Sequence, residues 1–415
     1  MLTELGKRAR LASRKLARLN ATQKNAALHT LAEALLADQI MILAANLSDV
    51  ESAKAAGLAP AMIDRLMLNE ARLADIAHSL RLVADLADPV GEIFEGSTQP
   101  NGLHIRKQRV PLGVLGVIYE ARPNVTVDVA GIAIKSGNAA ILRGGSETLN
   151  TNRAMIATLQ KALASSDVPA DAIQFIDSPD RALVLDLLHL RDYVDMIIPR
   201  GGAGLHEFCR ENSHIPVITG GIGICHLFVD DTADQDAALK IIHNAKTQRP
   251  SVCNALDTVL VHKDVAKEFL PRVVEHLAPA GVTFRAEAKA MVLLKHESVH
   301  PAGEKDFDTE WLSLVLGLKV VEGLDEAIEH IATHSTAHSD GILTRTDEHA
   351  QRFIAEVDSA AVYVNASTRF TDGTELGLGA EVAVSTQRLH ARGPMALREL
   401  TTYKWVIVGD GHVRK

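Results

Sequence analysis

The sequence predicts an α/β protein built on parallel sheets, and three observations lead to this class. Short apolar runs alternate with helix-like segments over residues 112–230. The same alternation restarts near residue 223 and continues to residue 390. Glycine pairs follow several of the apolar runs. Strands that alternate with helices favour parallel sheets covered on both faces, because parallel strands need long crossover connections.

The first half of the chain begins with helices and then alternates. Residues 1–90 carry alanine and leucine at helical spacing, and Asp88-Pro89 ends this region. Residues 104–110 (HIRKQRV) alternate in polarity and predict a strand, and a second strand starts at Pro111. Helices are then expected at 127–138, 151–168, 181–190 and 206–213, and strands at 139–144, 172–177, 195–202, 216–221 and 225–230.

The second half repeats the pattern and ends in a strand-like tail. Helices are expected at 235–248, 265–278, 324–335 and 348–357, and strands at 257–262, 312–321, 341–346, 361–365 and 400–411. These segments predict a second α/β domain over residues 223–390.

Composition excludes several classes of protein. The 415 residues are 47% hydrophobic and 23% charged, which is ordinary for a globular protein of two or three domains. A net charge of −9 argues against a nucleic-acid partner or an acidic membrane surface. No apolar run approaches the roughly 18 residues of a membrane span. The basic first 20 residues could be a mitochondrial transit peptide, but their leucine stripe favours a first surface helix.

The three cysteines, Cys209, Cys225 and Cys253, show no CxxC spacing. This disfavours a disulfide framework or a structural zinc site and fits a reducing cytoplasm. Cys253 lies between a turn-like segment and a strand. It is either a small buried side chain or a nucleophile whose thiolate Lys246 and Arg249 favour, and its local context leaves both readings open.

Glycine pairs at strand ends are the second candidate site. Neither the usual dinucleotide fingerprint nor a P-loop occurs. Ligands of open parallel sheets bind outside the carboxyl ends of strands, where glycine allows close approach. Arg143 beside Ser146 could hold a ribose phosphate, although a solvated arginine fits the spacing equally well. The pairs themselves, which also fit ordinary turns, are Gly144-Gly145, Gly201-Gly202 and Gly220-Gly221.

Three histidines recur every fourth residue at His330, His334 and His338. One helix face carrying them would suggest metal ligands, but the serines and Gly341 that follow indicate a helix end. We therefore predict no metal site.

Longer strings carry a more specific signal: YEARPNVTVD (119–128), VEGLDEAIEHIATHSTAHSDGI (321–342), VYVNASTRFTDG (362–373) and GLGAEVAVSTQRLHARGP (377–394). With them the chain resembles the aldehyde dehydrogenase superfamily over nearly its whole length, and more closely its acyl-phosphate reductases. The resemblance implies a Rossmann-type cofactor-binding domain (1–98 and 112–222), a second α/β catalytic domain (223–390) and a small β oligomerisation arm (99–111 and 399–415).

The resemblance also assigns roles to individual residues. It makes Cys253 the nucleophile and Asn124 the side chain that donates to the oxyanion. The substrate candidates are Arg122 and Arg369 as anion holders, with Asn365, Ser367 and Thr368 in the matching loop. The residues implied to bind NADP(H) are Arg143, Ser146, Gly201, Gly202, Gly221 and Glu310. Ser146 stands where an acid binds the ribose in typical members, so repulsion of a 2′-phosphate is removed.

One departure from the usual pattern bears on the reaction. Typical members carry a glutamate before Leu-Gly-Gly that activates water, whereas this chain has Ile218 at that place. An apolar side chain cannot take a proton from water. The thioester is therefore expected to exchange with phosphate, as an acyl-phosphate reductase requires.

The implied activity is NADPH-dependent reduction of L-glutamyl 5-phosphate to L-glutamate 5-semialdehyde, with release of phosphate, in proline biosynthesis. The alternatives are an oxidising enzyme that hydrolyses its acyl intermediate and a non-catalytic nucleotide-binding relative. The expected partners are the small acyl phosphate, further copies of the chain in a homo-oligomer and, transiently, glutamate 5-kinase. No nucleic-acid or membrane partner is expected.

Overall fold

The computed structural model describes residues 2–120, 122–220 and 222–414 and divides the chain into two compact units. Unit 1 comprises the residues up to Thr219, Gly377–Ala383 and the residues from Met395 onward. Unit 2 comprises Gly220–Leu376 and Val384–Pro394. The chain passes from unit 1 to unit 2 at Thr219, close to the predicted boundary at residue 222, and returns to unit 1 near its end.

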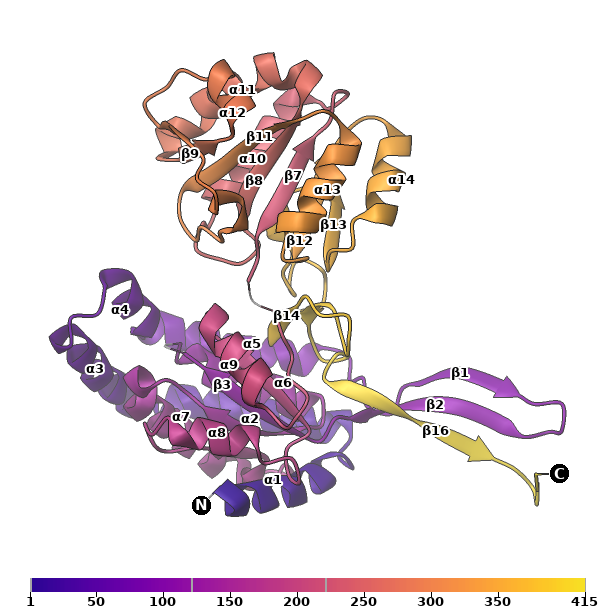
Figure 1. Ribbon diagram of the computed structural model, residues 1–415. Helices are drawn as coiled ribbons and strands as arrows, with labels where there is room; N and C mark the ends of the chain where they lie inside the picture. The colour runs from indigo at the N-terminus through magenta and orange to yellow at the C-terminus, as the bar shows by residue number, and fades with distance from the viewer. Residues whose placement is uncertain (1, 121, 221, 415) are drawn as a thin grey trace. The chain divides into compact units, whose positions relative to one another are not determined.

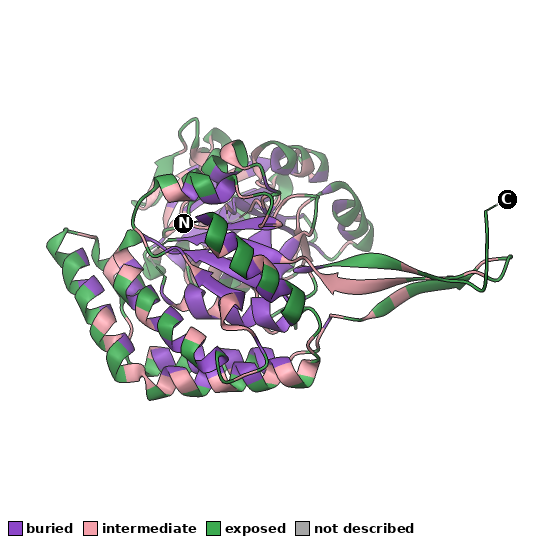
Figure 2. Ribbon diagram, turned by 90° about the horizontal axis from the view of Figure 1, so that it is seen from below, coloured by how far each residue is buried: buried purple, intermediate pink, exposed green. Residues whose placement is uncertain are grey.

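Unit 1 is built around a parallel sheet with the order β5-β4-β3-β6. Every residue of β3 and β4 is buried, which explains their uninterrupted apolar sequence. Figure 2 shows these buried strands with helices against them. The strands are β3 (Val114–Tyr119), β4 (Ala139–Arg143), β5 (Ile173–Phe175) and β6 (Met196–Arg200). The α/β class predicted from the alternation is confirmed here.

Nine α-helices belong to the described part of unit 1. The capping box at Asn20 begins α2, because the Asn20 side chain accepts the Gln23 N–H and the Gln23 side chain accepts the Asn20 N–H. The helices are α1 (Leu2–Leu16), α2 (Ala21–Ala37), α3 (Gln39–Ala55), α4 (Pro60–Leu66), α5 (Glu70–Asp85), α6 (Asn124–Lys135), α7 (Leu149–Leu163), α8 (Ala182–Leu188) and α9 (Ala203–Asn212).

No single helix among the described residues is long and apolar enough to cross a membrane. Only α2 and α3 taken together, across a 67° bend, reach that length and composition.

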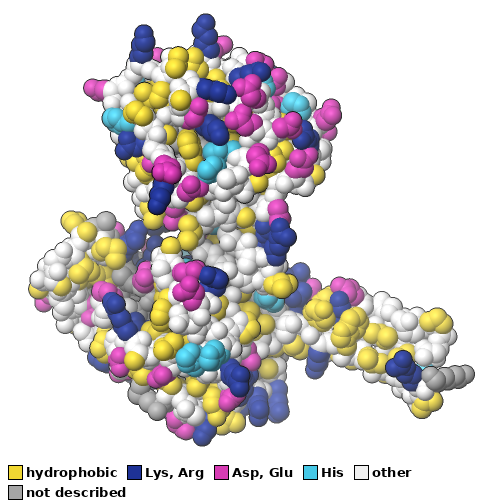
Figure 3. All heavy atoms as spheres, in the orientation of Figure 1, with side chains coloured by type: hydrophobic (Ala, Val, Ile, Leu, Met, Phe, Trp, Pro, Cys, Tyr) yellow, Lys and Arg dark blue, Asp and Glu magenta, His cyan; other side chains and the backbone are white. Residues whose placement is uncertain are grey.

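A three-stranded antiparallel sheet, which we call the arm, extends from unit 1. It consists of β1 (Ile93–Thr98), β2 (His104–Pro111) and β16 (Thr401–Val408), with β2 in the middle (Figure 1). The strand β1 lies inside the range predicted for the cofactor domain but pairs with β2. β16 is an edge strand whose Tyr403, Trp405 and Ile407 are exposed, and hydrophobic side chains are visible on the arm in Figure 3.

Unit 2 contains a seven-stranded sheet with the order β10-β9-β11-β8-β7-β12-β13, in which every pairing is parallel. Its strands are β7 (Cys225–Val229), β8 (Leu256–His262), β9 (Thr283–Ala286), β10 (Val299–Pro301), β11 (Val315–Val321), β12 (Ser339–Leu343) and β13 (Ala361–Val364). Its α-helices are α10 (Gln235–Thr247), α11 (Lys263–Leu277), α12 (Ala288–Leu293), α13 (Leu324–His334) and α14 (Asp347–Glu356). Separate apolar clusters, one containing Phe269 and one containing Phe353, form its core.

The strand predicted at 216–221 is wrong for its described residues. Val217 forms only an isolated bridge with Ile197, and the Ile218 N–H donates to the Ile197 carbonyl at 2.9 Å. These two contacts hold the segment against Ile197 of β6, but they do not form a continuous β-ladder. Two further short strands, β14 (Ala383–Ser385) and β15 (Gly393–Met395), pair with each other.

Candidate active site

The carboxyl ends of β3, β4 and β6 meet at one edge of the unit 1 sheet, because the strands are parallel neighbours. Arg143 ends β4, and Gly201 and Gly202 follow β6. Three of the residues predicted to bind the cofactor therefore lie at one edge of the sheet. Ser146 follows two residues after Gly144 and is exposed. Gly221, the remaining glycine candidate, lies outside the described residues.

Arg143 is buried beneath this edge and partly committed to the backbone. Its Nη1 donates to the Gly144 carbonyl at 2.8 Å and its Nη2 to the Pro179 carbonyl at 3.2 Å. Its Nε is buried without a hydrogen-bond partner in the structure. Burial lowers the pKa of Arg143, while nearby Glu147 opposes that shift. A buried guanidinium with one unsatisfied N–H fits an anion at this place.

Gly201 lies close to the side chains of Glu120 and Leu205. A Cβ at Gly201 would lie 2.6 Å from Cδ of Glu120, whose Oε2 accepts the Gly202 N–H at 3.1 Å. Gly202 is the residue before α9, and a Cβ there would meet no heavy atom within 4 Å. Glu120 thus fixes the turn between β6 and α9, a contact that sequence reasoning did not anticipate.

Asn124 is the first residue of α6, and its side chain is held by a carboxylate. Its Nδ2 donates to Oδ2 of Asp128 at 2.9 Å, one helical turn later. Burial raises the pKa of Asp128 to about 6, although the Asn124 hydrogen bond and the charge of Arg200 oppose the shift. This bond fixes the rotamer of the carboxamide. Arg122, two residues earlier, is exposed.

In unit 2, Cys253 lies in the loop between α10 and β8 and is partly buried. The three cysteines form no disulfide in the described chain. Burial raises the pKa of Cys209 to about 11 and raises that of Cys225 well above its ordinary value. Those two thiols are therefore held neutral, as expected for structural cysteines.

The contacts of the positively charged side chains around Cys253 differ from those expected from the sequence. Lys246 was expected to favour the thiolate, but its Nζ donates to the Leu256 carbonyl at 2.8 Å and lies 3.5 Å from Oδ1 of Asp257. Arg369 instead interacts electrostatically with Cys253. Burial lowers the pKa of Arg369, the neighbouring Arg249 lowers it further, and Cys253 opposes both. A guanidinium group in this loop favours binding of an anionic substrate beside it.

The backbone carbonyl of Cys253 packs against β7 and the residues before it. Cys225 donates its thiol hydrogen to this oxygen at a distance of 3.3 Å. A Cβ on Gly223 would lie only 1.5 Å from the same oxygen, so only glycine fits there. The Gly223 N–H donates to Oε1 of Glu310 at 2.9 Å, and burial raises the pKa of Glu310. The structure thus brings the predicted Glu310 and Cys253 to the same glycine.

The loop that follows β13 holds the other side of the cysteine loop through Asn254. Asn254 Nδ2 donates to the Thr371 carbonyl at 2.9 Å, and Thr368 Oγ1 donates to the Asn254 carbonyl at 2.7 Å. The Arg369 guanidinium also donates to Asn254 Oδ1 and, through Nε, to Gln248 Oε1 at 2.9 Å. Sequence reasoning missed Asn254, although its place directly after Cys253 was a usable signal.

Two residues predicted in the substrate loop make structural contacts. Asn365 adopts a φ of 54°, and its side chain pairs with both backbone groups of Thr344, at 2.9 and 2.8 Å. Ser367 Oγ accepts the Arg369 N–H at 3.3 Å. These contacts shape the loop that presents Arg369.

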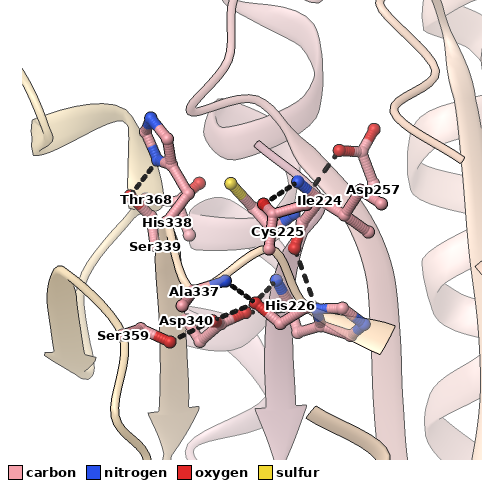
Figure 4. A network of polar contacts seen from close by, with 12 residues as sticks. Ile224, Cys225, His226, Asp257, Ala337, His338, Ser339, Asp340, Ser359 and Thr368 are labelled. Carbon is pink, nitrogen blue, oxygen red and sulfur yellow. Dashed lines mark hydrogen bonds and ion pairs between the residues drawn. The ribbon is translucent and has the colours of Figure 1, made fainter. Parts of the chain in front are cut away.

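Figure 4 shows the polar contacts around Cys225, the first residue of β7. The neighbouring His226 is fully buried, and its Nδ1 lies 3.1 Å from Oδ1 of Asp340 on β12. Of the histidines considered as metal ligands, His330 has its Nδ1 3.1 Å from the Lys319 ammonium, and His334 has its Nδ1 2.7 Å from Asp308. A cation beside His330 disfavours a second cation there.

Comparisons with known proteins point to one family. The profile of the Aldehyde dehydrogenase family matches residues 3–289. A gamma-glutamyl phosphate reductase from Roseiflexus castenholzii is 59% identical over 420 residues, covering 100% of this chain and 99% of the relative. One from Escherichia coli is 56% identical over 416 residues, covering 100% of both chains. The crystal structure of gamma-glutamyl phosphate reductase from Thermotoga maritima is 48% identical and superposes with a TM-score of 0.98 over 100% of both chains.

Proposed function

This chain belongs to the aldehyde dehydrogenase family and, within it, to the gamma-glutamyl phosphate reductases, and we propose that it reduces L-glutamyl 5-phosphate to L-glutamate 5-semialdehyde with release of phosphate. It is an oxidoreductase of proline biosynthesis that uses a nicotinamide cofactor. The observation that carries the proposal is the environment of Cys253. Its loop is held on both sides, through Gly223 and through Asn254, and the Arg369 guanidinium donates to Asn254, the residue that follows Cys253.

The reaction begins when the Cys253 thiolate attacks the acyl carbon of the acyl phosphate. The C–S bond forms, the C–O bond to phosphate breaks, and a thioester remains. A developing oxyanion needs donors already in position. The Cys253 backbone N–H and the Asn124 carboxamide are the two donors we propose. The Asp128 contact fixes the Asn124 rotamer before substrate arrives.

The cofactor proposal is NADP(H), held by Arg143, Ser146, Gly201, Gly202, Gly221 and Glu310. The buried Nε of Arg143 and the close approach at Gly201 fit the phosphate-bearing part of a dinucleotide. Ser146 carries no charge that would repel a 2′-phosphate. Glu310 is the group we propose for the nicotinamide ribose. When bound, NADPH supplies the hydride that reduces the thioester, after which the Cys253 thiolate leaves.

The resolution of the thioester distinguishes this function from hydrolytic oxidation. Ile218 is 2% exposed and holds no acid or base that could activate water. Phosphate is therefore the expected acceptor in the reverse direction. The hydrolytic dehydrogenase and the non-catalytic relative predict different results in the same assay.

That assay follows NADPH absorbance when purified protein is mixed with glutamate 5-semialdehyde and NADP⁺, with and without inorganic phosphate. Steady NADPH formation is expected only with phosphate, with a rate difference of at least about 100-fold, because nothing else resolves the thioester. NAD⁺ in place of NADP⁺ tests the 2′-phosphate preference. Equal rates without phosphate would establish hydrolysis, and no turnover at all would favour the non-catalytic relative.

Arg369 is our candidate for a substrate anion, together with Arg122, while Asn365, Ser367 and Thr368 shape the loop. Replacing Arg369 with alanine should raise the KM for the semialdehyde about tenfold, which is the loss of about 1.4 kcal/mol of binding. NADPH affinity should stay the same. The kcat should also fall, because Arg369 contacts Asn254. The variant Arg369→Lys keeps the charge as a control, and an unchanged KM in Arg369→Ala would remove this residue from the substrate site.

The arm is proposed to join copies of the chain into a homo-oligomer. β16 is an edge strand that pairs only with β2 among the described residues, and its Tyr403, Trp405, Ile407 and Val408 are exposed. Edges of this kind tend to pair with another chain. Light scattering over a wide concentration range should give at least twice the 44.7 kDa chain mass. A constant monomer mass would contradict this.

A transient complex with glutamate 5-kinase also remains a prediction, which is supported by the ready hydrolysis of acyl phosphates. A cytoplasmic location remains a prediction as well, which is supported by three cysteines without disulfides in the described chain.

A further inference from the structure

Asp257 occupies an unusual place four residues after Cys253. It is the second residue of β8 and is 2% exposed. Its Oδ1 accepts the backbone N–H of Trp311 at 3.2 Å, and its Oδ2 accepts that of Cys225 at 3.4 Å. One carboxylate therefore connects three segments: the start of β7, the start of β8 and the irregular segment at Glu310–Trp311.

Lys246, in the last turn of α10, completes the arrangement from the other end of the cysteine loop. It is fully buried, lies 3.5 Å from Oδ1 of Asp257 and donates to the Leu256 carbonyl at 2.8 Å. Because α10 ends at Thr247 and β8 begins at Leu256, this pair closes the base of the loop that carries Cys253.

The Asp257 carboxylate is linked through hydrogen bonds to both groups that the proposed reaction must align, Cys253 and Glu310. Cys225, whose N–H it holds, donates its thiol to the Cys253 carbonyl at 3.3 Å. Trp311, whose N–H it also holds, directly follows Glu310, which in turn accepts the Gly223 N–H. Asp257 thus constrains both the cysteine loop and the segment that contains Glu310.

Stability alone does not account for a buried ion pair here. Removing two charges from water costs about as much as their attraction returns, so an apolar pair of similar volume often folds equally well. Burial raises the pKa of Asp257 to about 6, with Lys246 opposing the shift, and burial lowers the pKa of Lys246. What an apolar pair cannot supply is the two directed hydrogen bonds to Cys225 and Trp311.

We propose that Asp257, held by Lys246, is a positioning residue that fixes Cys253 relative to Glu310. The inference rests on the proposed function, because it concerns the alignment of the thiol with the group proposed to hold the nicotinamide ribose. Small displacements matter at such a site, since an error of about 1 Å can cost 100-fold in rate.

The test separates position from stability with four variants: Asp257→Asn, Asp257→Glu, Lys246→Met and the double variant Lys246→Met/Asp257→Asn. Asp257→Glu keeps the charge but moves the carboxylate. The double variant is neutral and retains side-chain volume. Each variant is measured for its melting temperature, for kcat and the KM for NADP⁺, and for the rate at which iodoacetamide alkylates Cys253, assigned by peptide mapping. All rates are taken well below the melting temperature of that variant.

A second buried pair supplies the matched control. Lys24 is fully buried and lies 2.5 Å from Asp88 in unit 1, away from the cysteine loop in sequence and in unit. The variants Lys24→Met and Lys24→Met/Asp88→Asn should change the melting temperature as the corresponding unit 2 variants do. They should leave the alkylation rate of Cys253 within threefold of wild type.

Asp257→Glu and the double variant are expected to lower kcat and the Cys253 alkylation rate at least tenfold, even where the double variant recovers its melting temperature. An alkylation rate within threefold of wild type in either of them, or an equal loss in the Lys24 control, overturns the proposal. The alkylation rate measures the reactivity of the Cys253 thiol in the absence of substrate, so this outcome is distinct from failure of the proposed function. That failure would appear as wild-type protein without phosphate-dependent turnover.

Discussion

Cys253→Ala is expected to lower phosphate-dependent NADPH formation by at least about 10⁴-fold. The whole reaction passes through the Cys253 sulfur, so no other step compensates for its loss. NADP(H) affinity should stay within about twofold, because the groups proposed to hold the cofactor are all other residues. The reverse reaction measures the first quantity, and isothermal titration of NADPH measures the second.

The matched control for this variant is Cys209→Ala. Cys209 is as buried as any core residue and lies on α9 in unit 1. Its loss should cost some stability by leaving a small cavity, but it should leave kcat unchanged. If Cys253→Ala retained more than about one hundredth of the wild-type rate, or if Cys209→Ala lost as much activity, the assignment of the nucleophile would be wrong.

Most of the regular structure could be predicted from the sequence, because long periodic runs identify themselves. The buried strand β3 and the helices α7 and α11 are examples, each with apolar residues at the spacing of its element. Several short elements were missed, although the equally short β5 and β13 fall within predicted strands. β9 and β10 have four and three residues, α12 has six, and β1 is mostly exposed, so none carries a readable period.

The residues of the candidate site also differed in how far the sequence could predict them. Arg143 and Gly201 could be named as candidates from their strand-end positions, whereas Cys253 became a candidate nucleophile through the resemblance to a known family. Lys246 was considered as a cation that would favour the thiolate because it is near in sequence, whereas its ammonium lies 3.5 Å from Asp257 Oδ1. Asn254 and Asp257 depend on partners 32 to 117 residues away, which no local pattern reports. Contacts between distant segments are thus the part of a site that a single sequence conceals.

Gly223→Ala is the second substitution with a large expected effect, and its reason is purely steric. A Cβ at this position would lie 1.5 Å from the Cys253 carbonyl oxygen and 2.6 Å from its carbonyl carbon. Both are backbone atoms, so no side-chain rotation relieves the overlap. The cysteine loop or the segment before β7 must move by more than 1 Å, and kcat should fall about 100-fold.

The movement has two further consequences that can be measured. The Cys225 thiol should lose its bond to the Cys253 carbonyl, and the Gly223 N–H should lose Glu310. The alkylation rate of Cys253 should therefore fall together with kcat. The control is Gly303→Ala in the same unit, where the nearest heavy atom to an added Cβ is 3.5 Å away and ordinary contact results. If Gly223→Ala kept the kcat and alkylation rate of Gly303→Ala, the loop would not be anchored through Gly223. A fall in both quantities in Gly223→Ala alone would show that the backbone of residue 223 sets the position of the thiol.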